Sequence, residues 1–193
     1  MVDSIRTFIA AELTEPFREE LADTLAGLAA KRFNIRWVKP ENIHLTLVFL
    51  GDIHPRVLDD VNQAVTETAR PFTPIHLSAG GLGVFPGISR PRVVFLGLTG
   101  EIEPLHRLRT SLSNALEKVP ALDYRVEKRP FKAHLTLGRV KGRIDSRKLA
   151  AAMDGLQKIP AAPLTIDTIH VFKSDLRPSY AIYTKLKKGG YGE

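Results

Sequence analysis

Two segments of this chain are identical: His44-Leu45-Thr46-Leu47 and His134-Leu135-Thr136-Leu137. They begin at residues 44 and 134, near the middle of each half of a 193-residue chain, which indicates an internal duplication. Successive side chains of a strand point to opposite faces, so the His and Thr of each copy share one face and the two Leu share the other. We therefore expect two equivalent strands, with Leu packed under helices and His and Thr lining a cleft.

Residues around each motif copy predict a similar order of strands and helices from their apolar periodicity. In the first half we expect strands at 7–13, 36–38, 43–50 and 75–78 and helices at 15–31 and 55–69. In the second half we expect strands at 92–98, 131–140, 164–172 and 182–186 and helices at 102–119 and 146–156. Within the glycine-rich stretch 80–87, the segment 80–83 is interpreted as a flexible connector between the halves.

This pattern predicts an α+β fold with two pseudo-symmetric lobes. Each lobe is expected to be an antiparallel sheet with helices on its outer face, and a central cleft should separate the lobes. We expect one two-lobed domain over 1–193, with an approximate internal repeat of 1–80 and 90–187.

The composition of the chain excludes some classes of function and favours others. The chain has no cysteine, which excludes disulfides, a thiolate nucleophile and thiolate-bound metal sites. Its net charge of +7 favours anionic partners, among which nucleic acid is common, although charge alone fits an ordinary basic protein equally well. The sequence has neither a signal-peptide pattern at its start nor about 18 consecutive apolar residues, so we expect a cytoplasmic protein without a membrane span.

The paired motifs carry the chemistry. Two imidazoles facing one bound phosphodiester can take a proton from the attacking oxygen and give one to the departing oxygen, and histidine populates both forms near neutrality. The hydroxyls of Thr46 and Thr136 can donate hydrogen bonds to non-bridging oxygens. Arg139 can add positive charge where the phosphorane develops, but counting by twos from His134 puts it on the opposite face, so a bulge near Gly138 must redirect it.

Metal chemistry is not expected, because no Asp or Glu lies at ligand spacing from either motif histidine. The other four histidines are interpreted as structural or solvated: His54, His76, His106 and His170. The segment 80–83 is not a phosphate-binding loop, since no Lys-Ser or Lys-Thr follows it.

Beyond the motifs, the chain resembles the bacterial and archaeal RNA 2′,3′-cyclic phosphodiesterases, also called 2′-5′ RNA ligases, of the two-histidine phosphoesterase superfamily. The resemblance covers nearly the whole chain. It lies in the segments 6–10, 36–51, 83–86, 90–97, 131–139 and 174–176 and in Tyr183.

This resemblance implies a metal-free, cofactor-free enzyme that opens terminal 2′,3′-cyclic phosphates of RNA, including tRNA fragments, to 2′-phosphates, with reversible 2′-5′ ligation as a further activity. It implies that His44 is the proton donor to the leaving 3′ oxygen and His134 the proton acceptor from water, in a monomer. It also implies substrate or phosphate contacts from Arg92, Phe8 and Phe95. Two residues depart from the family pattern: Ala133 stands where proline is usual, and Phe95 stands where tryptophan is usual.

Two other functions stay open on the sequence alone. One is a catalytically silent RNA-binding module that uses the same cleft, although binding does not require two proton-transfer groups. The other is a two-histidine enzyme that acts on small cyclic nucleotides or 2′-5′ oligonucleotides.

Overall fold

Two antiparallel sheets form the framework of the protein, for which a computed structural model describes residues 4–127, 129–156, 159–177 and 181–186. The four-stranded sheet has the order β3 (Leu45–Ile53), β1 (Ile5–Ala11), β8 (His170–Leu176), β9 (Ala181–Leu186). The five-stranded sheet has the order β2 (Ile35–Trp37), β6 (His134–Val140), β5 (Val93–Gly100), β4 (Ile75–Phe85), β7 (Leu164–Ile166). The outer limits of the expected domain, 1–3 and 187–193, lie outside the described residues.

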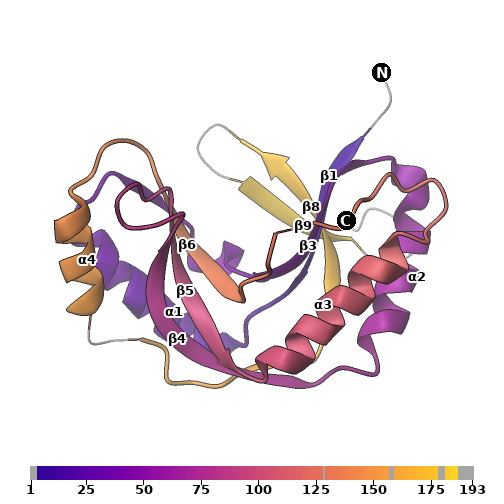
Figure 1. The fold of residues 1–193 in the computed structure, drawn as a ribbon, viewed down its shortest axis with the longest axis horizontal. Helices are drawn as coiled ribbons and strands as arrows, with labels where there is room; N and C mark the ends of the chain where they lie inside the picture. The colour runs from indigo at the N-terminus through magenta and orange to yellow at the C-terminus, as the bar shows by residue number, and fades with distance from the viewer. Residues whose placement is uncertain (1–3, 128, 157–158, 178–180, 187–193) are drawn as a thin grey trace.

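Helices cover these sheets in pairs. The elements are α1 (Glu15–Ala29), α2 (Leu58–Ala69), α3 (Ile102–Leu116) and α4 (Ser146–Asp154), with short 3₁₀ turns η1 (Pro40–Asn42) and η2 (Pro55–Val57). Figure 1 shows α2 and α3 beside the four-stranded sheet and α1 and α4 beside the five-stranded sheet. The expected α+β fold with helix-covered antiparallel sheets is confirmed. None of the helices in the described ranges has the length and apolar character that a membrane crossing requires.

Each sheet combines strands from both halves of the chain, and the two sheets do so in an equivalent order. In the four-stranded sheet, motif strand β3 pairs with β1, and β1 pairs with β8 from the far end of the chain. In the five-stranded sheet, motif strand β6 pairs with β5, and β5 pairs with β4 from the first half. Each sheet therefore takes its third strand from the other half, and we propose that the chain is a single domain made of two interlocked copies.

The motif strands lie at the junction of the sheets, where β3 contacts β6 (Figure 1). Their leucines face the core as expected: Leu45, Leu47, Leu135 and Leu137 are buried. Burying four leucine side chains stabilises the fold by roughly 1.5–3 kcal/mol each. This packing holds the opposite face of both strands toward the cleft.

Two expectations about the strands are wrong. Residues 80–85 are not a connector, because β4 continues through them and pairs with β5 as far as Phe85 and Val93. Glycine allows a close backbone approach here, since a Cβ on Gly80 would lie 3.1 Å from the carbonyl oxygen of Gly97. The expected strand 164–172 is two strands in different sheets, β7 and the start of β8.

Candidate active site

A cavity of about 220 Å³ lies between the sheets and is lined by residues of both motifs. His44 and Thr46 reach it from the four-stranded sheet, and His134 and Thr136 reach it from the five-stranded sheet. Residues separated by half the chain thus meet in one space, with their Leu neighbours buried behind them. The alternation of a strand accounts for this arrangement, because each His shares a face with the Thr two residues later.

Both motif histidines are held by the same local hydrogen bond. His44 Nδ1 lies 2.9 Å from the carbonyl oxygen of Asn42, and His134 Nδ1 lies 2.6 Å from that of Lys132. A carbonyl can only accept, so each Nδ1 carries the hydrogen and Nε2 is left as the nitrogen that exchanges a proton. For His44 the carbonyl is positioned by the 3₁₀ turn η1, which ends at Asn42. The two rings therefore have the same tautomer and the same reactive atom.

A bulge at the fourth residue of each motif redirects the chain after it. On β3 the register skips Leu47, because Val48 pairs with Ile9 and Thr46 pairs with Ala10. On β6 it skips Leu137, because Gly138 pairs with Val94 and Thr136 pairs with Phe95. Each bulge is one extra residue that reverses the alternation beyond it.

As a result, the fifth residue after each histidine faces the cleft. In the second motif this residue is Arg139, which lines the cavity, so the bulge expected near Gly138 is present. In the first motif it is Phe49, which also lines the cavity and is 62% exposed. The two symmetry-related positions thus present a guanidinium and an aromatic ring to the same space.

Aromatic rings enclose His44. Phe8 stacks on its imidazole with 4.7 Å between ring centroids, and Tyr183 meets it edge-on at 5.0 Å. Phe172 is nearly parallel to both rings, with its centroid 5.4 Å from that of Phe8 and 6.3 Å from that of His44. Burial lowers the pKa of His44 below its ordinary value, and the hydrogen bond to the Asn42 carbonyl partly offsets this effect.

The surroundings of His134 are different, because neither of its two aromatic neighbours stacks on it. Phe85 lies 5.0 Å and Phe95 lies 5.5 Å from its ring centroid, both nearly perpendicular to it. These two rings stack on each other at 4.2 Å. A Cβ on Gly83 would lie 2.3 Å from the Phe95 ring, so only glycine leaves room for it.

The resemblance implies substrate contacts from Phe8, Phe95 and Arg92, but only Phe8 lines the cavity. Phe8 lines the cavity, but its ring is buried against His44 and Phe172, so its observed contacts support the histidine. Phe95 contacts His134 but is not among the residues that line the cavity. Arg92 does not line it either; its side chain is exposed, and its backbone joins β4 to β6 through bonds to Phe85 and Val140.

Tyr183, Arg6 and Phe49 are among the cavity residues that received no role from the sequence. Burial raises the pKa of the Tyr183 phenol, while the nearby guanidinium groups of Arg139, Arg36 and Arg6 act to lower it. Arg6 could have been found by alternation, since it lies two residues before Phe8 on β1. Tyr183 was indicated only by the family resemblance, because the pairing of β8 with β9 that brings it to the cavity is not visible in the sequence.

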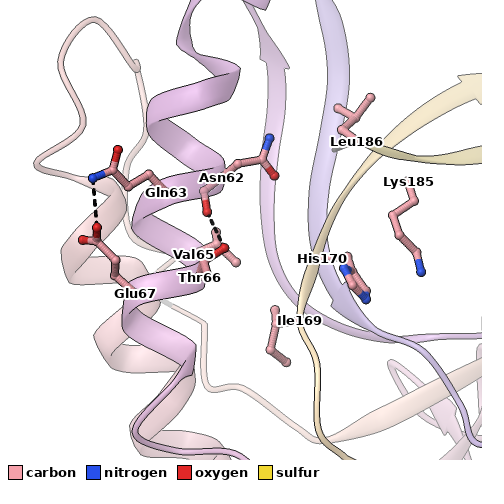
Figure 2. Close-up of a pocket in the computed structure, with 9 residues that line it drawn as sticks. All are labelled: Asn62, Gln63, Val65, Thr66, Glu67, Ile169, His170, Lys185 and Leu186. Carbon is pink, nitrogen blue, oxygen red and sulfur yellow. Dashed lines mark hydrogen bonds between the residues drawn. The ribbon is translucent and has the colours of Figure 1, made fainter. Parts of the chain in front are cut away.

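A larger cavity of about 510 Å³ lies between α2 and the strands β8 and β9. Figure 2 shows its lining, which includes His170 and Lys185 but neither motif histidine. Its polar side chains bond largely within the protein: Gln63 donates to Glu67, and Lys185 pairs with Glu12 at 2.6 Å. Within the described ranges, no group of three or more His, Asp or Glu is placed to hold a metal ion.

Comparisons with known proteins show the family to which the chain belongs. The family model of the 2′-5′ RNA ligase superfamily matches residues 17–178. Two proteins named RNA 2′,3′-cyclic phosphodiesterase, from Methanothermobacter thermautotrophicus and Archaeoglobus fulgidus, are each 33% identical over 95% of this chain and over 97% and 98% of their own lengths. The crystal structure of the protein TT0787 from Thermus thermophilus is similar, with a TM-score of 0.74, 27% identity and coverage of 95% of this chain and 96% of that one.

The fold and the pair of motifs define a two-histidine phosphoesterase. The chain belongs to the 2′-5′ RNA ligase superfamily.

Proposed function

We propose that this enzyme hydrolyses 2′,3′-cyclic phosphate ends of RNA to 2′-phosphates by metal-free acid–base catalysis. One observation carries the proposal: two histidines with matched Nδ1–H bonds to backbone carbonyls line one cavity with their Nε2 atoms left for proton transfer. The names of the relatives supply the substrate class.

In the proposed step His134 Nε2 takes a proton from a water molecule as its oxygen forms a bond to phosphorus. The bond from phosphorus to the 3′ oxygen breaks, and protonated His44 gives that oxygen the proton from Nε2. The product carries a 2′-phosphate and a free 3′-hydroxyl. His134 is then protonated and His44 neutral, and exchange with solvent restores both. The assignment of donor and acceptor follows the family resemblance.

The remaining cavity residues fit this reaction. Thr46 and Thr136 hydroxyls can donate to the non-bridging oxygens, and the Arg139 guanidinium can stabilise the negative phosphorane. The exposed ring of Phe49 offers a surface on which a base can stack. If the 5′-hydroxyl of a second RNA strand replaces water, the same proton transfers form a 2′-5′ phosphodiester, and the reverse reaction regenerates the cyclic end.

We further propose that the enzyme acts as a monomer in the cytoplasm, on fragments such as cleaved tRNA. The absence of cysteine agrees with a reducing compartment. Size-exclusion chromatography with light scattering should give a mass near 21.4 kDa.

The experiment that tests the reaction is incubation of chelator-treated protein with RNA ending in a 2′,3′-cyclic phosphate, followed by identification of the product isomer. We expect a 2′-phosphate at an unchanged rate in EDTA. His44→Ala and His134→Ala should each lower turnover by about 10²- to 10⁴-fold, while His76→Ala, outside the cavity, should not.

Other outcomes identify other functions. A 3′-phosphate product, or loss of activity in EDTA, would contradict the proposed chemistry. RNA binding without turnover would indicate a silent binding module. Turnover of small cyclic nucleotides or 2′-5′ oligonucleotides in preference to RNA ends would assign the alternative substrate.

A further inference from the structure

Two arginines lie side by side at the edge of the five-stranded sheet. Arg36 of β2 and Arg139 of β6 are direct partners in the antiparallel register. Directly opposite side chains in such a pair have Cβ atoms about 4.5–5.5 Å apart and share one face, and like charges there destabilise the sheet. Since Arg139 lines the catalytic cavity, its partner Arg36 lies on the same face of the sheet, next to the residues that line the cavity rather than among them.

A third arginine comes from the other sheet. Arg6 of β1 also lines the cavity, on the face of β1 that carries Phe8. All three guanidinium groups act on the Tyr183 hydroxyl, where they oppose the rise in its pKa that burial causes. Arg6, Arg139 and Tyr183 line one cavity and Arg36 adjoins Arg139, so three positive charges converge on the part of the cleft beside Tyr183.

The positive charge of these three arginines is more than the reacting cyclic phosphate requires. A cyclic phosphate is a diester with one negative charge, and Arg139 with two threonine hydroxyls can satisfy its oxygens. Each further nucleotide of an RNA strand adds one negative charge on its internucleotide phosphate. Three converging cations in a cleft focus the field on a ligand with more than one such charge.

We propose that Arg36 and Arg6 bind the internucleotide phosphate that precedes the reacting cyclic phosphate, so that the enzyme is specific for oligonucleotide ends over mononucleotides. This inference rests on the proposed function. The arginine fork suits a phosphodiester, because two parallel N–H donors match two non-bridging oxygens.

Three substrates test it: a mononucleotide 2′,3′-cyclic phosphate, a dinucleotide ending in the same group, and that dinucleotide with an uncharged methylphosphonate linkage. We expect the wild type to prefer the charged dinucleotide by about 10- to 100-fold in kcat/KM over the other two. Arg36→Gln and Arg6→Gln should each remove most of that preference. The dependence of log kcat/KM on log salt for the charged dinucleotide should become shallower by about 0.7 per arginine lost.

Arg107→Gln is the matched control, because Arg107 is exposed on α3 and does not line the cavity. It removes the same charge and should leave the preference intact. Equal wild-type rates on all three substrates, or an equal loss on all three in both variants, would overturn the inference while leaving the proposed function standing. No turnover of any substrate by the wild type would instead refute the proposed function.

Discussion

The ring of Phe8 lies almost parallel to the imidazole of His44, with an interplanar angle of 26°. Because this contact helps to exclude water from the histidine, Phe8→Leu should raise the pKa of His44 toward its ordinary value. NMR titration of the His44 ring protons measures the change. Phe17→Leu, in the main core away from the cavity, is the control: it should lower the free energy of unfolding without moving that pKa.

The pH profile of kcat/KM can assign the role of His44. Burial places its pKa below 6.5, so one limb of the profile should lie below that pH. If His44 is the donor, its protonated form is needed and activity falls as pH rises through this limb. His134→Ala should keep this falling limb and lose the other. A limb that rises with pH in the same variant would make His44 the acceptor.

Arg139 should contribute to the transition state more than to binding, because the bulge at Leu137 brings it to the cavity. Arg139→Ala should cost about 2–4 kcal/mol of transition-state stabilisation, comparable with the loss of an oxyanion donor. Lysine should rescue it poorly, since an ammonium cannot form the planar bidentate contact. Turnover and RNA affinity at two salt concentrations give the result; unchanged turnover in Arg139→Ala would exclude the role.

Phe49 should act on the base of the substrate. Phe49→Ala should weaken binding of an RNA end by about 1–3 kcal/mol, which is the usual worth of one stacked base. Tryptophan at this position should restore the affinity. Ile88→Ala, which removes another exposed apolar side chain, is the control. An equal effect of Phe49→Ala on a substrate with an abasic terminal nucleotide would show that stacking is not the cause.

Gly83 should control His134 through Phe95. A methyl group at residue 83 would collide with the Phe95 ring, so Gly83→Ala should displace that ring from His134 and lower turnover. Gly81→Ala is a close control on the same strand, because a Cβ there meets nothing within 4 Å. Similar kinetics for both variants would show that His134 does not depend on Phe95.

The sequence predicted the features that depend on local periodicity. The two motif strands, their buried leucines and the bulge near Gly138 all follow from counting residues along a strand of period two. The sheet membership of β4 and β8 could not be predicted this way, because strand pairing across the chain leaves no local signal. The prediction of a connector at 80–83 is wrong because glycine, which permits a flexible connector, also permits close backbone packing.

The position of Tyr183 in the site could not be predicted from local periodicity either. Its strand β9 reaches His44 only through β8 and β1, so its place beside the histidine depends on three strand pairings. Arg36, like Tyr183, is among the residues that carry the family resemblance, yet only its register opposite Arg139 shows what it adjoins.

Each sheet takes its third strand from the other half of the chain, and this affects the order in which the sheets can form during protein synthesis. When residues 1–85 have left the ribosome, β1 and β3 of one sheet and β2 and β4 of the other are available, so neither sheet is complete. The four-stranded sheet must wait for β8, which begins at His170, and β1 is exposed on that side until then. Cutting the chain between β4 and β5 should therefore yield two fragments that each need the other to fold. Mixed together, they should regain activity as a split enzyme.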